Sequence, residues 1–470
     1  QTDRTYSDSK SHLFGGFLTA NYTYKNTYMA DVSIRMDGSS EFGTDKKWGI
    51  FWSAGAGVNL HKMEFLSDYS NLDILKVRAN VGRTGKTGFQ PYAAENIYNI
   101  DTNDWYMTGI GATLKYLGNP NLSWESATTY NIGLDLTMFQ NRFDISFDYY
   151  HKLTQDLVTE MALPTSSGFA KYTENIGEVV NKGFEIDLSV NVVRNRDFSL
   201  DLGFNLAHND NKMTKISDAL ARYNARVDEY YQQEKNIYVS GSINGGASNF
   251  KNTSDYLSEN IVYTKPYMKY EEGQSLTGIT AMRSLGINPA DGREIFIRPD
   301  GTLTTEWNAS EQTRVGDTEP DASGSFRVSA RYKNWSLFTT FLYEFGGDAY
   351  NNTLITSVEN VDILKRNVDR RVLSDRWYTP GQEARFKSIN ANATVTKPTS
   401  RMVQKNNYVK FNSLQLSYEF DRAKLRNIGL RQLKLSLSMQ DIAQWSTVKR
   451  EMGTSYPFAR TFSLVLNTSF

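Results

Sequence analysis

The sequence predicts an all-β protein whose strands form a transmembrane antiparallel β-barrel, and three observations support this interpretation. Apolar and polar residues alternate with a period of two in segment after segment. Short connections between these segments alternate with long polar ones. Aromatic residues gather beside the short connections, where the interface of a lipid bilayer would place them.

The alternation is clearest in the segment FEIDLSVNV, residues 184–192. Its aromatic and aliphatic side chains occupy one face of an extended strand, and its charged and polar side chains occupy the other. The same pattern recurs in residues 141–150, 326–332 and 462–470. A half-buried strand of a soluble sandwich would show this pattern too, so alternation alone leaves sandwich and barrel open.

The alternating segments predict about thirteen strands. They lie at residues 12–25, 27–37, 50–61, 74–85, 124–139, 141–158, 179–193, 197–210, 323–333, 335–346, 407–420, 432–445 and 460–470. The count is odd, whereas a complete bacterial barrel has an even number of strands with both ends on the periplasmic side. We therefore expect this chain to form part of a barrel.

Short hairpins are predicted at Lys25-Asn26, Gln140-Asn141 and Lys333-Asn334, because asparagine tolerates the positive φ that two-residue turns require. The aromatic residues beside them are Tyr22, Tyr24, Tyr28, Phe139, Phe143, Tyr332 and Trp335. A barrel in the outer membrane has short turns on its periplasmic side and long loops outside the cell. The short turns are therefore expected to be periplasmic.

The long connections lie near residues 86–123, 211–322 and 347–406 and are expected to be extracellular loops. Residues 1–11 are polar and rich in turn-forming residues, and we expect them to be the remnant of another such loop. The barrel portion then occupies residues 12–470.

Composition excludes several classes of protein. The 470 residues contain 52 basic and 52 acidic side chains, so no net positive charge favours nucleic acid as a partner. The mean hydropathy is -0.52, and no stretch approaches the roughly 20 apolar residues of a membrane helix. The absence of cysteine removes disulfides and thiolate metal sites.

No motif for catalysis or for a cofactor is found. The histidines His12, His61, His151 and His208 lie far apart in the sequence, without the spacing of a metal site. No G-x-S-x-G sequence occupies a strand-to-helix turn. Asp291-Gly292 and Asp300-Gly301 are interpreted as tight turns. We therefore expect neither an enzyme nor a resident cofactor.

Several ordered stretches resemble the SusC/RagA family of TonB-dependent transporters. The longest, NYTYKNTYMADVSIRMDGSSEFGTDKKWGIFWSAGAGVNL, matches that family's pattern of a tyrosine-rich hairpin, R-x-D-G-S-S-x-F-G and W-G-x-F-x-S. Further matches follow in the family's order: LKVRANVGRTG, NLSWESATTYNIGLDLTMFQNRFDISFDYYHKLTQDLV, GFAKYTENIGEVVNKGFEIDL, YVKFNSLQLSYEF and SYPFARTFSLVLNTSF. The resemblance spans residues 12–470, and the long loops match weakly.

The resemblance implies the C-terminal barrel portion of an outer-membrane importer of glycans or peptides. The plug domain is expected to be absent from this chain. Family members also carry a signal peptide, a TonB box and early barrel strands. Plugged transporters have about 22 strands, so about nine would come from a companion chain or segment. That companion could be a separate gene product, a proteolytic fragment or a part of the same chain.

The resemblance also implies partners and a location. A SusD-like surface lipoprotein would cap the barrel, and TonB would pull on the plug through the companion segment. The location would be the outer membrane of a Gram-negative bacterium of the Bacteroidota, with lipid around the barrel. Two alternatives stay open: a SusC-like barrel that serves as a scaffold in an assembly or secretion complex, and a soluble all-β protein that binds or hydrolyses glycans.

Three sets of candidate residues follow. Charged residues opposite apolar neighbours would line the lumen of a barrel: Arg35, Arg78, Asp144, Asp148, Glu185, Asp187, Arg327 and Arg331. Loop aromatics could stack on sugar rings or contact a partner protein: Trp105, Tyr106, Tyr116, Tyr230 and Tyr231. Phe470 resembles the terminal aromatic residue by which the outer-membrane assembly machinery recognises barrels.

Overall fold

The largest element of the fold is an antiparallel sheet of 13 strands, which confirms the predicted fold class. The structure is a computed structural model. It describes residues 10–42, 46–87, 93–106, 109–162, 171–175, 177–218, 220–222, 224–225, 269–361, 368–388, 396–421, 425, 429–449 and 460–469. In sheet order the strands are β1 (Leu13–Tyr24), β2 (Tyr28–Ser39), β3 (Trp48–Asn59), β4 (Leu72–Lys86), β7 (Glu125–Met138), β8 (Phe143–Gln155), β11 (Gly177–Arg194), β12 (Phe198–Ile216), β18 (Ala322–Tyr332), β19 (Trp335–Phe345), β22 (Tyr408–Glu419), β23 (Gln432–Ser446) and β24 (Thr461–Ser469).

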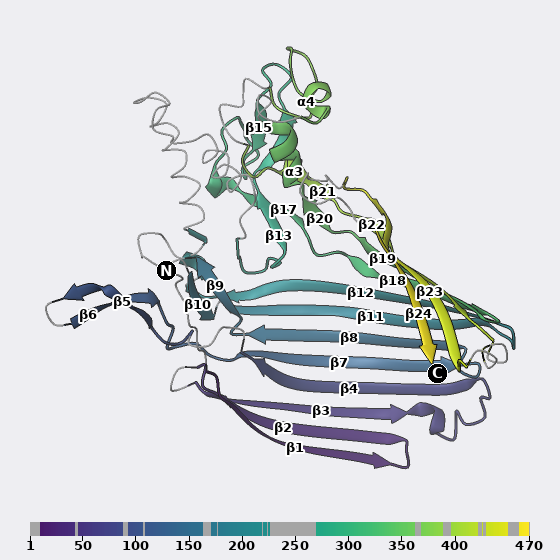
Figure 1. The fold of residues 1–470 in the computed structure, drawn as a ribbon. Helices are drawn as coiled ribbons and strands as arrows, with labels where there is room; N and C mark the ends of the chain where they lie inside the picture. The colour runs from purple at the N-terminus through teal and green to yellow at the C-terminus, as the bar shows by residue number, and fades with distance from the viewer. Residues whose placement is uncertain are drawn as a thin grey trace. The chain divides into compact units, whose positions relative to one another are not determined.

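Two compact units make up the chain. The first comprises Gln1–Ile186, Asp210–Tyr223 and Tyr270–Gln274, and the second comprises Asp187–Asn209, Asn224–Lys269 and Ser275–Phe470. Within the first unit, β1 to β4, β7 and β8 run side by side (Figure 1). Within the second unit, β18, β19, β22, β23 and β24 pair in that order, each antiparallel to the next.

The short hairpins form at the predicted positions, but their loops comprise residues 25–27, 139–142 and 333–334. Only the third is therefore a two-residue turn, and there Lys333 and not Asn334 has positive φ. Tyr24 pairs with Tyr28 across the first turn, where Lys25 and Asn26 have φ values of 50° and 53°. In the turn between β7 and β8, Gln140 and Asn141 both have a φ of 60°. Lys333 has a φ of 50° between β18 and β19. Positive φ lets the turn follow the twist of the two strands, so the strands can pair up to the turn.

The register of the second unit assigns its side chains to two faces, because residues paired across strands point to the same side. Next to the short turns, one row is aromatic: Tyr332, Trp335 and Tyr418. Aliphatic residues follow on the same face, such as Leu337 paired with Leu416 and Leu437 paired with Leu464. A second aromatic row then contains Phe204, Phe326, Phe341 and Phe411. This layered surface is the apolar face of the sheet.

The connections between the strands of the large sheet contain small strands and helical turns that the sequence did not predict. The strands are β5 (Ile97–Tyr106), β6 (Gly109–Tyr116), β9 (Val158–Ala162), β10 (Lys171–Asn175), β13 (Gly278–Ala281), β14 (Arg283–Ile287), β15 (Glu294–Ile297), β16 (Leu303–Thr304), β17 (Thr313–Asp317), β20 (Asp348–Tyr350) and β21 (Val403–Lys405). The helical segments are η1 (Leu60–Lys62), η3 (Ala309–Glu311), α3 (Asn352–Leu354), η4 (Ile355–Glu359), α4 (Arg371–Ser374) and η6 (Ser400–Met402). In the described part of the chain, no helix has the length and apolar character needed to cross a membrane.

The predicted Asp-Gly turns occur within these connections. Gly301 has a φ of 85° in the turn between β15 and β16. Gly292 has a φ of 71° and lies against the ring of Trp377, which leaves no room for a Cβ atom. Both positions therefore require glycine for conformation, and Gly292 requires it for packing as well.

The best-buried part of the second unit is not in the large sheet but among its long connections. Six apolar side chains form a cluster there: Leu354, Ile355, Val358, Val372, Phe386 and Met402. Beside it, the Arg401 side chain lies between two buried carboxylates, with Nη1 at 2.6 Å from Glu359 Oε2 and Nη2 at 3.0 Å from Glu294 Oε2. We call Glu294, Glu359 and Arg401 the loop core.

Neighbouring groups complete the loop core. Thr396 Oγ1 and Thr399 Oγ1 each donate a hydrogen bond of 2.5 Å, to Glu359 and Glu294 respectively. Arg376, which is fully buried, donates to the carbonyl oxygens of Val358 and Glu359 at 2.6 and 2.8 Å. Buried charges are costly unless they are paired and hydrogen-bonded, and the charges of Glu294, Glu359 and Arg401 are. The two connections that carry β14–β15 and α3–β21 are thus joined by the Arg401–Glu294 ion pair.

The loop core is expected to weaken at low pH. Burial alone raises the pKa of the Glu359 carboxyl, but the charge and hydrogen bonds of Arg401 outweigh it and lower that pKa from its ordinary value of 4.5 to about 2. A carboxyl with a lower pKa in the folded state stabilises that state above its unfolded pKa and loses this contribution as the pH falls to the folded pKa. Pepsin cleavage between residues 348 and 405 should therefore rise as the pH is lowered from about 4.5 to 2.

Two variants of the intact protein sharpen this prediction. Arg401→Met should make the segment sensitive to protease already at pH 7, because removing one partner of a buried pair costs about 3–5 kcal/mol. Arg293→Met is the matched control, since the Arg293–Asp291 pair of the same unit is mostly exposed and such pairs contribute about 0–1 kcal/mol. Equal protease sensitivity of the two variants would contradict a stabilising loop core.

Candidate functional site

The face of the sheet opposite the apolar face carries paired charges. On β4, β7 and β8, Arg78 Nη2 lies 2.6 Å from Asp148 Oδ2, and Arg78 Nε lies 3.2 Å from Asp135 Oδ2. Ser146 Oγ donates a hydrogen bond of 2.9 Å to Asp135 Oδ1. We call Arg78, Asp135, Ser146 and Asp148 the Arg78 network. It joins three strands, and two of the predicted lumen residues, Arg78 and Asp148, meet in it.

A glycine makes the Arg78 network possible. Arg78 is paired across strands with Gly133 of β7, which in turn is paired with Asp148 of β8. A Cβ atom at Gly133 would lie 2.5 Å from Arg78 Cζ. Because Gly133 has no side chain, the arginine lies flat across the middle strand and reaches the far one. Sequence analysis did not identify this role of Gly133.

The same arrangement occurs in the second unit. Arg327 of β18 is paired with Gly203 of β12, and a Cβ atom at Gly203 would lie 2.0 Å from Arg327 Nε. The arginine lies across that glycine, with Nη2 at 3.6 Å from Asp187 Oδ1 of β11. Arg327 and Asp187 are both predicted lumen residues. Twice, therefore, an arginine crosses a glycine to pair with an aspartate of the next strand.

Aromatic residues accompany the charges at the end of β2. Arg35 Nε lies 2.7 Å from Asp37, and Arg35 is paired across strands with Phe51 of β3. Phe42, just beyond β2, is only 2% exposed and stacks on Trp124 with 4.5 Å between ring centroids. The Trp124 ring also meets Phe51 edge-on at 5.4 Å.

Glycine again leaves room for these rings. A Cβ atom at Gly85 would lie 2.1 Å from the Phe51 ring, and one at Gly49 would lie 2.5 Å from it. The stretch RMDGSSEF thus places a charged pair, a glycine and the buried Phe42 in one short segment. The aromatic cluster of Phe42, Phe51 and Trp124 was not predicted, although the quoted R-x-D-G-S-S-x-F pattern contains one of its members.

The remaining predicted lumen residues are consistent with the same face. Asp144 accepts a hydrogen bond of 2.7 Å from Thr137, its cross-strand partner. Arg331 is paired with Ser199 and Ser336. Glu185 follows Phe184, whose ring stacks on Phe147 of the apolar face, so alternation directs Glu185 to the opposite side.

Of the predicted loop aromatics, Tyr116 is the one whose side chain the structure describes. Tyr116 lies at the end of β6, is 55% exposed and has the Lys115 ammonium 5.3 Å from its ring centroid. Trp105 and Tyr106 end β5, where their backbones pair with Ile110 and Gly109. Tyr230, Tyr231 and Phe470 lie outside the described residues. These candidates stay predictions.

The charges of this face are arranged in ion pairs along its surface. Among the described residues, no three His, Cys, Asp or Glu side chains are grouped as a metal ion would need them. The charges lie along the surface and neutralise one another in ion pairs that are partly exposed to solvent. Such a surface can be wetted, can contact a polar partner and can border an aqueous passage.

Comparison with known proteins shows which family the chain belongs to. Residues 1–270 match the family described as "TonB dependent receptor-like, beta-barrel". TonB-dependent receptor P3 of Formosa agariphila is 28% identical over 98% of this chain and 46% of its own length. TonB-dependent receptor SusC of Bacteroides thetaiotaomicron is 32% identical over 76% of this chain and 35% of its own length.

Solved structures agree on the fold. The RagAB peptide importer in its "open-open" state has a TM-score of 0.75 and 20% identity, and the match covers 98% of this chain and 47% of that one. The chain thus spans less than half the length of the curated relatives and of the structure it matches. The family match extends over more than half of the chain. The chain therefore belongs to the TonB-dependent receptor β-barrel family of the outer membrane, a non-enzymatic family, and its relatives include TonB-dependent receptors P3 and SusC of the Bacteroidota.

Proposed function

We propose that the chain is the C-terminal barrel portion of a SusC-like, TonB-dependent importer of glycans or peptides. The observation that carries this proposal is the match to TonB-dependent receptors along almost the whole chain, 98% of it for receptor P3. RagAB is a peptide importer, which supports peptides as one class of cargo. Glycans are the second proposed class of cargo, because the sequence resembles the SusC/RagA family. No catalytic step is part of it.

The polar face is proposed to line the lumen. The apolar face carries two aromatic rows with aliphatic residues between them, as the lipid-facing band of a barrel does. The Arg78 network and the Arg327–Asp187 pair then point inward. Because these arginines lie flat and already have carboxylate partners, they give a polar wall that a plug can contact without being held by strong new ion pairs.

The rest of the barrel is proposed to pair with the two edges of the sheet. In the sheet order, β1 neighbours only β2, and β24 neighbours only β23, among the strands that the structure describes. An unpaired peptide group in hydrocarbon costs several kcal/mol, so an edge cannot face lipid. We propose that a companion segment supplies strands to both edges and carries the plug on which TonB acts. A SusD-like lipoprotein would cap the extracellular side.

A deletion strain tests the proposed import. Loss of the gene should abolish growth on particular oligosaccharides or peptides as sole nutrient, and the full-length wild-type protein should restore it. A full-length protein without its TonB box should not restore it, although it reaches the membrane. Unchanged growth on every nutrient in a broad panel would contradict import and would favour a scaffold role.

An arginine on the apolar face should destabilise the barrel. We expect Leu464→Arg in β24 to lower the yield of folded, heat-modifiable barrel, because arginine at mid-membrane depth costs about 2–4 kcal/mol. Ser463→Arg is the control, since Ser463 is paired with Ser438 on the polar face. Similar yields from the two variants would argue against lipid on the apolar face.

A methyl group at position 133, where the Arg78 side chain crosses β7, should lower the stability of the folded barrel. Gly133→Ala would displace the Arg78 guanidinium and break its contact with Asp148, which for a partly exposed pair should cost about 1 kcal/mol. The temperature at which the folded barrel converts to the unfolded form on gels should fall. Gly16→Ala is the matched control, because a Cβ atom there meets nothing within 4 Å. An equal or larger shift for Gly16→Ala would refute the role given to Gly133.

A further inference from the structure

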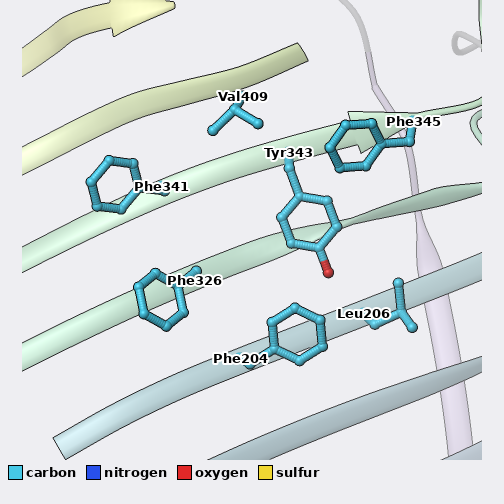
Figure 2. A pocket seen from close by; sticks show the side chains of 7 residues that line it. All are labelled: Phe204, Leu206, Phe326, Phe341, Tyr343, Phe345 and Val409. Carbon is cyan, nitrogen blue, oxygen red and sulfur yellow. The ribbon is translucent and has the colours of Figure 1, made fainter. Parts of the chain in front are cut away.

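A groove of about 600 Å³ lies on the apolar face of the second unit, away from the paired charges. We call it the aromatic groove. Its seven lining residues come from β12, β18, β19 and β22: Phe204, Leu206, Phe326, Phe341, Tyr343, Phe345 and Val409. Figure 2 shows Phe326 and Phe341 on one side of the groove and Tyr343 with Phe345 on the other.

The register explains why a hollow forms here. Gly324 of β18 is paired with Tyr343 of β19 and with Leu206 of β12, so the middle strand contributes no side chain at this position. The Tyr343 ring leans over Gly324 toward β12 and stacks on Phe204 with 5.8 Å between ring centroids. On the other side, Phe341 stacks on Phe411 at 4.5 Å. Phe326 lies between Phe204 and Phe341 in the register, and these rings together with Tyr343 border the groove.

The groove offers no polar partner to a ligand. Its one polar side-chain atom, Tyr343 Oη, donates a hydrogen bond of 2.7 Å to the carbonyl oxygen of Asn205. The Asn205 Oδ1 atom in turn accepts a hydrogen bond of 2.6 Å from the Ser325 backbone N–H. The polar groups at its floor are therefore occupied by one another. Only an apolar group gains by entering this groove.

The position along the strand places the groove in one leaflet. Tyr343 lies eight residues after Trp335, which borders the short turn. Eight residues span about 26 Å along a strand, or about 20 Å across the membrane at a barrel tilt of roughly 40°. The apolar band of such barrels is about 25 Å tall, so the groove lies in the half next to the long connections. In this family's orientation that half is the outer leaflet.

A polar group lies just beyond the groove on the same face. His208 follows Leu206 by two residues on β12, so alternation directs both side chains to the same side. The His208 Nδ1 atom is 2.7 Å from the carbonyl oxygen of Asp321 and donates to it, which orients the ring. An apolar groove ending at a polar ring matches an amphiphile with a hydrocarbon chain and a polar head.

We propose that the aromatic groove binds one acyl chain of an outer-leaflet membrane lipid, with the head group at the level of His208. The groove is continuous with the band that faces lipid, so acyl chains are what surrounds it. The aromatic rings keep the acyl chain in place, because their stacking fixes the shape of the groove. The proposal needs only the barrel in the outer membrane and is independent of what the importer carries.

Filling the groove tests the proposal. The full-length protein is extracted in mild detergent, mixed with dipalmitoyl phosphatidylethanolamine and examined by native mass spectrometry. The wild type should retain one lipid at low lipid excess. Val409→Trp, which extends a large ring into the groove, should need about tenfold more lipid for the same occupancy. Leu337→Trp enlarges a side chain on the same face outside the groove and should bind as the wild type does.

A second variant and the oligomeric state complete the experiment. Leu206→Trp fills the groove from β12, and it should reproduce the loss seen for Val409→Trp in barrels that stay heat-modifiable. Equal lipid binding by wild type, both groove variants and Leu337→Trp would overturn the proposal. So would a wild-type dimer that the groove variants lose without any change in lipid retention, since the occupant would then be a second copy of the protein.

Discussion

Backbone hydrogen bonding in hydrocarbon is the constraint on which the rest of this structure depends. A peptide group without a partner costs several kcal/mol in lipid, so each spanning strand needs a neighbour on both sides. The 13 strands pair in sequence order, with short turns of positive φ at Lys25, Asn26, Gln140 and Asn141, and the edge strands β1 and β24 are proposed to gain their second neighbours from the companion segment. Beside Gly324, side chains add to these backbone pairings: Tyr343 Oη donates a hydrogen bond to the Asn205 carbonyl, and Asn205 Oδ1 accepts one from the Ser325 N–H.

Pairing then divides the side chains between two environments. Alternation puts aromatic and aliphatic residues on one face and charges on the other, with no freedom to shift by one residue. Glycine is used on both faces for the same geometric reason. Gly133 and Gly203 let arginines cross a strand on the polar face, and Gly324 lets Tyr343 lean across one on the apolar face. Glycine thus lets arginines lie flat on the polar face and contributes to a groove on the apolar face.

The sequence predicts the large sheet well, because a period of two is a local property that each strand displays by itself. The predicted strand at 432–445 and the observed β23 (Gln432–Ser446) show the accuracy. Contacts between distant segments were not predictable in this way. Arg78 and Asp148 are 70 residues apart, and Arg401 and Glu294 are 107 apart.

The small strands in the long connections were missed for a related reason. Segments such as β14 and β15 are four or five residues long, too short to display a clear period. Their stability comes from the loop core and its neighbouring apolar cluster, which only the folded chain brings together. The aromatic groove likewise arises from side-chain directions on four strands, although each of its residues was assigned to a strand from the sequence alone.

The central claim is that one face of the sheet contacts lipid and the other contacts water, and site-directed spin labelling tests it most directly. The chain contains no cysteine, so single cysteines can be introduced at successive positions of β19, from Ser336→Cys to Leu342→Cys, in the full-length protein. In bilayers, labels at 337, 339 and 341 should collide with oxygen, and labels at 336, 338 and 340 should collide with a water-soluble nickel complex. An accessibility profile without this period of two, or one with the two faces exchanged, would contradict the account.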